Sequence, residues 1–185
     1  MMKNEIRLIC KNKRKEMTKE DVERKSISAQ NAFLDSQLYK DARVIMLYYP
    51  IGNETDTHLI AKTAFSDGKH LIYPVTDEKT GEITPFYADE NNEFHIGAFS
   101  VPEPEMKNTA CKSDIDVVIV PGIAFGNSGV RIGFGKGCYD RFLKNIKAVK
   151  IGFCYDFQVC GGFTGEEHDI SMDFLITESG VRNCE

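Results

Sequence analysis

One glycine-rich stretch, residues 121–143, combines the residue types that bind an anionic ligand: PGIAFGNSGVRIGFGKGCYDRFL. Glycines allow backbone amide groups to approach a ligand closely, because no Cβ stands in the way. Arg131 and Lys136 supply positive charge, and Asp140 supplies a carboxylate that a metal could use. The stretch is therefore predicted to be an anion-binding loop, with a flexible turn as the alternative interpretation.

Three glycines in this stretch alternate with other residues, at positions Gly133, Gly135 and Gly137. If the backbone is extended there, they share one side and form a ridge against which a planar or phosphorylated ligand could lie. Neither common phosphate-binding motif fits. A Walker loop needs a glycine at Val130 and a hydroxyl residue at Gly137, and the dinucleotide fingerprint needs a glycine at Cys138.

Each charged candidate also has a purely structural interpretation. Arg131 and Lys136 could be solvated surface charges, although the glycines between them favour an anion site. Asp140 is either an acid at a helix start or a magnesium ligand, since magnesium takes one or two carboxylates together with phosphate and water. His168 and Asp169 are either a turn pair or part of a site. The pattern alone leaves these alternatives open.

Further charged candidates lie near the N-terminus. Four basic residues follow at spacings of four, four and three and so share one face of a predicted helix: Lys3, Arg7, Lys11 and Arg14. Such a stripe is usually a wet surface, and it would matter only if folding brings it to the glycine-rich stretch. Glu54, in the segment Gly-Asn-Glu-Thr-Asp-Thr, is either a turn residue or a carboxylate that faces a ligand.

The elements that must position these residues alternate along the chain. Helices are predicted over residues 3–17, 18–36, 56–68 and 139–146, and strands over 43–49, 70–75, 83–88, 116–120, 148–154 and 174–177. Residues 77–82 are predicted to be a turn, and residues 89–112 and 158–171 to be irregular connections.

Strands that alternate with helices predict an α/β fold. We expect a three-layer αβα sandwich with a mostly parallel mixed sheet, with antiparallel pairing around residues 77–88, as one domain over residues 1–185. The strand at residues 116–120 would place the glycine-rich stretch at its carboxyl end, where open α/β sheets bind ligands.

The composition excludes several classes of protein. The chain has 185 residues, 42% apolar and 28% charged, which is typical of an ordinary globular protein. Its net charge of −5 argues against non-specific nucleic-acid binding as the main role. No apolar run is long enough to span a bilayer, and the charged N-terminal residues lack the hydrophobic core of a signal peptide. We expect neither a nucleic-acid partner nor a membrane.

The six cysteines do not form a recognisable framework. They are Cys10, Cys111, Cys138, Cys154, Cys160 and Cys184. Because no Cys-x-x-Cys pair occurs, the pattern does not favour a zinc site. Free thiols in a reducing cytosol are the simpler interpretation, and we expect a cytoplasmic protein.

Several separate motifs occur here together and in one order. They are Lys3-x-x-Ile-Arg7 with Arg14, Tyr49-Pro-Ile-Gly-Asn-Glu54-Thr-Asp-Thr57, Val101-Pro-Glu-Pro104, Pro121-Gly-x-Ala-Phe125, Gly129-x-Arg131-x-Gly-x-Gly-x-Gly137-x-Tyr139-Asp140-Arg-Phe, His168-Asp169, and Asp173 before Ile176-Thr-Glu178. In this combination the chain resembles the 5-formyltetrahydrofolate cyclo-ligase (5,10-methenyltetrahydrofolate synthetase) family over essentially its whole length.

The resemblance implies an enzyme of folate metabolism. Its reaction would convert 5-formyltetrahydrofolate, with or without a polyglutamate tail, to 5,10-methenyltetrahydrofolate with ATP and Mg²⁺, releasing ADP and phosphate. ATP would phosphorylate the formyl oxygen, and N10 would attack the activated carbon. We expect a monomeric enzyme whose substrate is a small molecule.

The resemblance also implies roles for individual residues. The catalytic residues would be Lys136, Arg131 and Glu54. ATP would be bound by Lys3, Arg7, Arg131, Gly133, Gly135, Lys136, Gly137 and Tyr139. The folate would be bound by Arg7, Tyr49, Glu54, Phe134, Gly135, Lys136, Gly137 and Cys138. Magnesium would be held by Asp140 and Asp169, directly or through water.

Three positions depart from the family pattern. Cys138 replaces a tyrosine, Gly126 replaces an aspartate near the loop, and Phe134 stands where tyrosine or arginine is frequent. The changes at Gly126 and Cys138 motivate an alternative hypothesis, a folate- or nucleotide-binding module without turnover. A sugar-phosphate isomerase or acyl-CoA transferase on a related layered fold is a third, and it would need no ATP.

Overall fold

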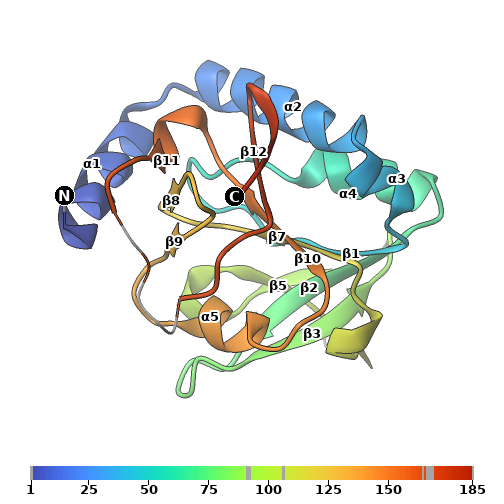
Figure 1. Ribbon diagram of the computed structural model, residues 1–185. Coiled ribbons are helices and arrows are strands. Elements are labelled where there is room, and N and C mark those ends of the chain that lie inside the picture. The colour runs from blue at the N-terminus through green and yellow to red at the C-terminus, as the bar shows by residue number, and fades with distance from the viewer. Residues whose placement is uncertain (1, 91–92, 106, 164, 166–168, 185) are drawn as a thin grey trace.

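A computed structural model describes residues 2–90, 93–105, 107–163, 165 and 169–184 (Figure 1). Its centre is an eight-stranded sheet with the order β13-β12-β10-β7-β1-β2-β3-β6. The parallel strands are β1 (Val44–Met46), β2 (His70–Thr76), β7 (Val117–Val120), β10 (Val149–Phe153) and β12 (Phe174–Thr177). The antiparallel strands are β3 (Ile83–Ala88), β6 (Asn108–Thr109) and β13 (Gly180–Asn183). The predicted mixed, mostly parallel sheet is confirmed.

Helices cover both faces of this sheet, which confirms the three layers (Figure 1). One face carries α2 (Lys19–Leu34), α3 (Gln37–Asp41) and α4 (His58–Ser66), and the other carries α5 (Cys138–Leu143). Side chains of successive strand residues point to opposite faces, so Ile45 packs on the first side and Met46 on the second.

Two of the predicted helix starts and the predicted turn at residues 77–82 are borne out by local hydrogen bonds, and in the turn Asp77 Oδ1 accepts the Thr80 N–H at 2.7 Å. Thr18 Oγ1 accepts the Asp21 N–H at 3.1 Å and so caps α2. Asp56 Oδ1 accepts the His58 N–H at 2.6 Å at the start of α4. The predicted strand at residues 43–49 is shorter than expected, since β1 ends at Met46.

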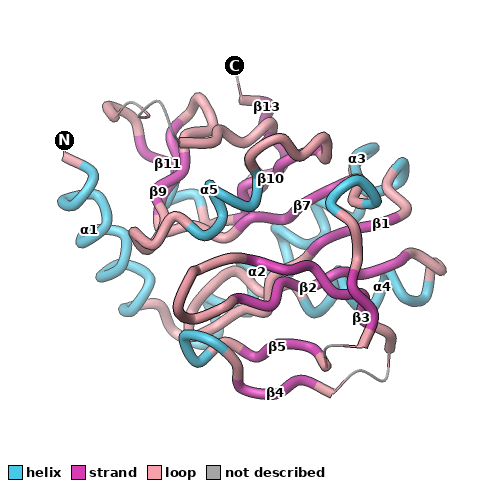
Figure 2. The backbone as a smooth tube through the Cα atoms, turned by 90° about the horizontal axis from the view of Figure 1, so that it is seen from below, coloured by secondary structure: helices cyan, strands magenta, loops and turns pink. Residues whose placement is uncertain are grey.

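The predicted irregular connections contain strands that the sequence pattern did not indicate. Within residues 89–112, β4 (Phe94–Ile96) pairs with β5 (Pro102–Pro104), and the short helix η1 (Ala98–Ser100) joins them (Figure 2). The helix η2 (Lys112–Asp114) follows β6. Within residues 158–171, β11 (Val159–Cys160) follows η3 (Asp156–Gln158) and pairs with β8 (Ala124–Gly126). Strands of two or three residues have too little periodicity to be recognised locally.

A small second sheet supports the first helix. β8 lies between β11 and β9 (Arg131–Ile132). The helix α1 (Lys3–Glu16) contacts β8 and η3, at the left of Figure 1. This arrangement brings the basic face of α1 to the glycine-rich stretch.

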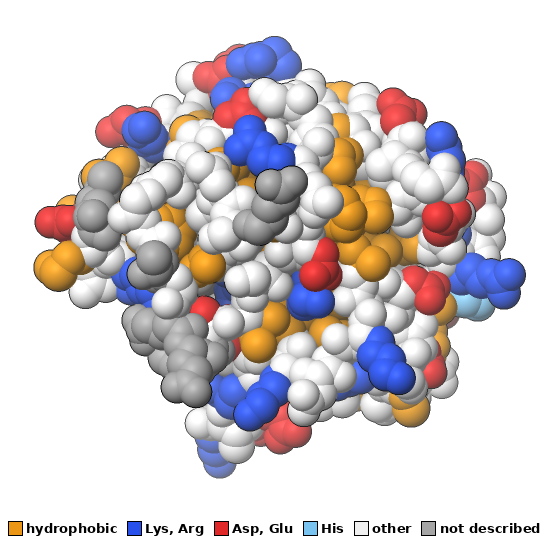
Figure 3. Space-filling view, in the orientation of Figure 1, with side chains coloured by type: hydrophobic (Ala, Val, Ile, Leu, Met, Phe, Trp, Pro, Cys, Tyr) orange, Lys and Arg blue, Asp and Glu red, His pale blue; other side chains and the backbone are white. Residues whose placement is uncertain are grey.

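The surface carries charged side chains of both signs (Figure 3). Figure 3 shows positive and negative side chains interspersed over this face of the molecule. Among the described residues, no helix is both long and apolar enough to cross a membrane.

Candidate active site

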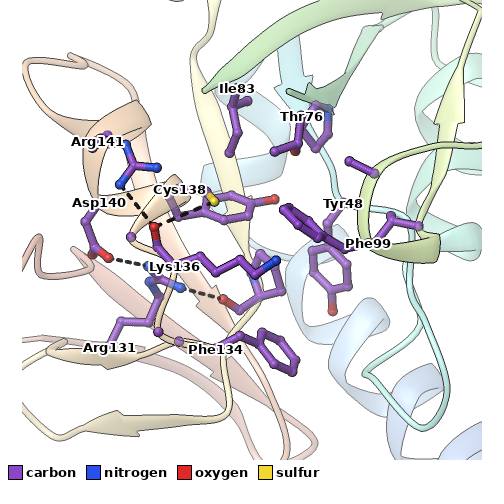
Figure 4. A pocket seen from close by; sticks show the side chains of 18 of the residues that line it. Tyr48, Thr76, Ile83, Phe99, Arg131, Phe134, Lys136, Cys138, Asp140 and Arg141 are labelled. Atoms are coloured by element: carbon purple, nitrogen blue, oxygen red, sulfur yellow. Dashed lines mark hydrogen bonds and ion pairs between the residues drawn. The ribbon is translucent and has the colours of Figure 1, made fainter. Parts of the chain in front are cut away.

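A pocket of about 1240 Å³ opens at the carboxyl ends of the central strands. Its floor follows β1, β2 and β7, with Tyr48, Thr76 and Pro121 among the lining residues. Its walls are the first turns of α1, the glycine-rich stretch and the connection between β4 and β5, as the close view in Figure 4 shows in part. The predicted placement at the carboxyl edge of a sheet is therefore correct.

Residues 133–137 of the glycine-rich stretch form a turn, the glycine turn, that lines this pocket between β9 and α5. Gly135 and Gly137 have positive φ angles, +97° and +65°, and Gly137 is the N-cap of α5. Because extended backbone has negative φ, the predicted ridge of alternating glycines is wrong. Gly133 has a different role, since a Cβ there would lie only 2.6 Å from Arg131 Nη1. The glycines leave room for Arg131 and permit the turn.

Arg131 is buried and held in place from several sides. Its Nη2 lies 2.9 Å from Asp140 Oδ2, and its Nη1 donates to the Pro121 carbonyl at 3.4 Å. Its guanidinium lies 5.5 Å from the ring centroid of Tyr139. The interpretation of Arg131 as a solvated surface charge is therefore wrong.

The Arg131–Asp140 pair has hydrogen-bonding atoms that are not used within the protein. Arg131 Nε and Asp140 Oδ1 are buried and have no hydrogen-bond partner. An orphaned buried carboxylate oxygen and N–H are costly unless a ligand satisfies them. Both residues line the pocket, so a bound group could supply the missing partners.

Lys136 is exposed and extends over the pocket (Figure 4). Its Nζ lies 3.3 Å from the ring centroid of Phe99, which projects from the β4–β5 connection. Among the described residues, no carboxylate lies within ion-pair distance of this ammonium group. A cation held by a ring face alone can be captured by a phosphate.

The basic face of α1 reaches the site. Lys3 Nζ lies 2.7 Å from Asp169 Oδ2, and Arg7 Nε donates to the Gly133 carbonyl at 3.0 Å. Arg14 Nη1 lies 3.5 Å from Glu54 Oε1. The wet-surface interpretation of this face is wrong for these three basic residues.

Glu54 serves both a turn and the pocket. Its Oε2 accepts the Ile51 N–H at 3.2 Å, and the side chain is only 7% exposed while lining the pocket. Burial raises the pKa of Glu54 above its ordinary value, and the nearby Arg14 guanidinium and the Ile51 N–H offset part of this increase. The two interpretations of Glu54 are thus compatible.

The aromatic and thiol candidates line the same pocket: Tyr49, Phe134, Cys138 and Tyr139. Phe134 is half-exposed, and the Lys11 ammonium lies 5.4 Å from its ring centroid. Of the three departures from the family pattern, Phe134 and Cys138 thus face the ligand space. Gly126 is buried in β8 and is not a lining residue, and a Cβ there would meet the Phe163 ring at 3.4 Å.

The two predicted metal ligands fit an ion that takes few protein ligands. Asp140 and Asp169 both line the pocket, and Asp140 offers its orphaned oxygen. The described part of the chain holds no cluster of three potential ligands. Magnesium suits such a pair, because it keeps several waters and phosphate oxygens. His168, a candidate in the same loop, lies outside the described residues.

Phe99 and Arg141 are among the lining residues that were not predicted from the sequence. Phe99 carries no motif, and its positive φ of 56° is visible only in the structure. Arg141 follows Asp140 in the glycine-rich stretch, and its guanidinium donates to the Lys136 carbonyl at 3.0 Å and to the Thr80 and Gly81 carbonyls at 3.2 Å. Its position in the motif was the available signal.

Comparisons with known proteins agree with one another. The profile described as the 5-formyltetrahydrofolate cyclo-ligase family matches residues 1–178. The 5-formyltetrahydrofolate cyclo-ligase of Mycoplasma genitalium is 31% identical over 94% of this chain and 96% of its own length. The 5,10-methenyltetrahydrofolate synthetase of Aquifex aeolicus has a solved structure that superposes with a TM-score of 0.88 at 33% identity, covering 100% of this chain and 94% of that one. The corresponding synthetase of Mycoplasma pneumoniae gives a TM-score of 0.76 at 26% identity, over 96% and 99%.

Proposed function

The chain belongs to the 5-formyltetrahydrofolate cyclo-ligase family, and from that premise we propose that it makes 5,10-methenyltetrahydrofolate from 5-formyltetrahydrofolate, with ATP as phosphoryl donor and Mg²⁺. One observation carries this proposal. A single pocket of about 1240 Å³ joins a buried carboxylate, Glu54, to a group of cations around a glycine turn. Typical pockets for one ligand measure roughly 300–1,000 Å³, so this one has room for a nucleotide beside a folate.

The proposed reaction must convert the formyl oxygen, a poor leaving group, into a good one. The formyl oxygen on N5 belongs to an amide-like group and does not depart by itself. It attacks the γ-phosphorus, the bond from phosphorus to ADP breaks, and ADP leaves. N10 then attacks the formyl carbon, the carbon–oxygen bond breaks, phosphate departs with the electron pair, and N10 loses its proton. Catalysis of this kind consists mainly of positioning and charge stabilisation.

The nucleotide phosphates belong at the cationic side of the pocket. We assign them to Lys3 and Arg7 on α1 and to Arg131 and Lys136 on the glycine turn, with backbone from Gly133, Gly135 and Gly137 and the ring of Tyr139. Arg131 is fixed by Asp140 and can act as a rigid fork, whereas the exposed Lys136 can follow the transferring phosphoryl group. The catalytic charge stabilisation is therefore assigned to these two residues.

Asp140 and Asp169 would hold magnesium, which would neutralise charge on the phosphates when bound. Both carboxylates already face cations, Arg131 and Lys3. This arrangement places them beside the proposed phosphate site and leaves the Asp140 oxygen Oδ1 for the ion or its water.

The folate belongs at the opposite side of the pocket. Glu54 would accept hydrogen bonds from N–H groups of the pterin ring, because a buried carboxylate is an acceptor with few competing waters. Tyr49 and Phe134 offer ring faces, and Cys138 supplies a small wall where an aromatic residue would take more space. Arg7 and the turn from Gly135 to Cys138 border both ligands.

Oxygen-18 in the formyl group tests the proposed chemistry directly. If the formyl oxygen is phosphorylated, each turnover transfers the label to inorganic phosphate, and ADP appears in equal amount. Mass spectrometry of the released phosphate measures this. Unlabelled phosphate, with the label in water, would refute phosphorylation of the formyl oxygen while leaving the identity of the product untouched.

Arg141 is proposed as a positioning residue for the glycine turn. Its guanidinium links the Lys136 carbonyl to the β2–β3 turn through the Thr80 and Gly81 carbonyls. Arg141→Met should raise KM for ATP about 10-fold and lower kcat less, because three hydrogen bonds of a charged donor hold the turn. Steady-state kinetics measure the split. Lys147→Met, a change of an exposed residue nearby, should leave both constants unaltered.

The proposal also covers domain organisation, oligomeric state and location: residues 1–185 form one domain, and the protein is a cytoplasmic monomer. The free state of the six cysteines supports a reducing compartment. Light scattering after size exclusion, with the expected mass of 20.8 kDa, tests the monomer.

A further inference from the structure

Two cysteines that are 150 positions apart in the sequence lie side by side outside the pocket. The sulfur atoms of Cys10 and Cys160 lie 3.9 Å apart, and both residues are free thiols. Both sulfurs also approach the Phe157 carbonyl oxygen, at 3.9 and 3.8 Å. No sequence pattern indicated this pair, because one member lies on α1 and the other on β11.

The thiol pair lies in the small apolar cluster that attaches α1 to the rest of the molecule. Within α1 only Ile6 and Cys10 are buried, and Cys10 is only 1% exposed. They pack against Ile123, Ala124 and Ile132, with Cys160 and Phe163 at the edge. Neither cysteine lines the pocket. The apolar packing that attaches α1, the helix that carries Lys3 and Arg7, is therefore concentrated at this cluster, while its polar contacts lie at the pocket.

Access to the pair is unequal. Cys160 is partly exposed and is therefore the more accessible residue of the pair, whereas Cys10 is enclosed. Burial, together with the neighbouring Cys160, raises the pKa of the Cys10 thiol to about 12. Cys160 is thus the position where an external reagent would react first.

We propose that Cys10 and Cys160 form a covalent modification site, at which a low-molecular-weight disulfide oxidises both thiols to one disulfide that ties α1 to β11. The Cys160 thiolate attacks the small disulfide and releases one thiol, which gives a mixed disulfide. The Cys10 thiolate then attacks the Cys160 sulfur and releases the second thiol. Two protein thiols are oxidised, and one external disulfide is reduced to two thiols.

The geometry demands little movement. A disulfide needs a sulfur–sulfur distance of about 2.05 Å, so each sulfur must move by about 1 Å. Side-chain rotation can supply most of this shift, because the pair already shares one apolar cluster. The bond would restrain α1 and hold its basic residues against the glycine turn. The oxidation state of the two thiols would therefore control how often this helix opens locally.

The test uses the full-length chain, folded and at neutral pH, with glutathione disulfide as the oxidant. We expect an intact mass lower by two hydrogen atoms and a linked peptide that joins Cys10 to Cys160. Hydrogen exchange in α1 should slow on the order of 10-fold relative to the same protein after reduction, because local opening of the helix is hindered. Cys10→Ser and Cys160→Ser should both abolish the link, and Cys111→Ser, at an exposed cysteine, should retain it.

Two results would overturn the proposal, and neither depends on catalysis. One is a protein that accumulates only mixed disulfides with glutathione, or that links other cysteines. The other is a Cys10–Cys160 bond that leaves the exchange of α1 amides unchanged. A failure of the proposed enzymatic reaction would leave both readouts intact, so the two proposals can fail separately.

Discussion

Lys136→Met should lower kcat for ATP-dependent turnover on the order of 10³-fold while leaving Tm within about 2 °C of the wild-type value. The proposed role of Lys136 is to neutralise charge on the transferring phosphoryl group, and the loss of one such cation or donor typically costs about 10²–10³-fold or more. Its side chain is exposed and contacts the Phe99 ring, so its removal leaves no buried charge behind. Steady-state kinetics at saturating ATP and folate, with a thermal melt, measure both values.

The matched control for this change is another exposed lysine of the same region. Lys147→Met removes an equal charge from the surface without touching the pocket, and it should keep kcat within about 2-fold. A Lys136→Met variant that retains more than about a tenth of the wild-type kcat would contradict the assigned role. If the loss appears only in KM, Lys136 binds the nucleotide without acting in the transition state.

Glu54→Gln should lower kcat/KM for the folate on the order of 10²-fold. A buried carboxylate that accepts hydrogen bonds contributes about 1.5–3 kcal/mol when its partner is charged or strongly polarised, and the amide accepts less strongly. The variant retains the size of the side chain and an oxygen for the Ile51 N–H. Kinetics with varied folate at saturating ATP measure the change. An unaltered kcat/KM would show that Glu54 does not contact the folate.

Glu54→Gln should also change how the stability of the folded protein depends on pH, and the sign of this change follows from the pKa of Glu54. Burial raises the pKa of Glu54 in the folded chain above its unfolded value. The contribution of Glu54 to stability is therefore fully present below the unfolded pKa and is lost as pH rises through the folded pKa. The glutamine side chain of Glu54→Gln does not titrate. The difference Tm of the variant minus Tm of the wild type should therefore increase as pH rises from the unfolded pKa of Glu54 to its folded pKa.

Thermal melts at a series of pH values, in the absence of ligands, test this sign. Glu78→Gln, at an exposed position of the β2–β3 turn, is the control and should show no such trend. A difference in Tm that falls as pH rises would mean that Arg14, rather than burial, dominates the environment of Glu54.

The sequence predicted those parts of the fold whose cause is local. The run at residues 117–120 is apolar and β-branched, and it forms the fully buried β7. The alternation of helices and strands indicated the layered α/β sheet, and the helix predicted over residues 18–36 begins at Thr18, which caps it. In contrast, β4, β5 and β11 have two or three residues each and exist because of partners elsewhere in the chain.

The site was predictable in its residue types and less so in its geometry. The motif around Arg131 indicated an anion site, but the burial of its guanidinium depends on Asp140 and Pro121, and this arrangement appears only in three dimensions. The basic stripe of α1 reaches the pocket because β8 and η3 hold the helix beside the glycine turn. The positive φ angles of Gly135 and Gly137 replaced the predicted ridge, since spacing alone does not specify backbone conformation.

The most direct measurement is near-ultraviolet absorbance of 5,10-methenyltetrahydrofolate, with the protein, 5-formyltetrahydrofolate and Mg²⁺, in the presence and absence of ATP. Our account predicts that product accumulates only with ATP and that it stops when Mg²⁺ is chelated. Product without ATP would contradict phosphorylation as the driving step. No product in either case, alongside calorimetric binding of the folate, would contradict turnover and identify the chain as a binding module of the same fold.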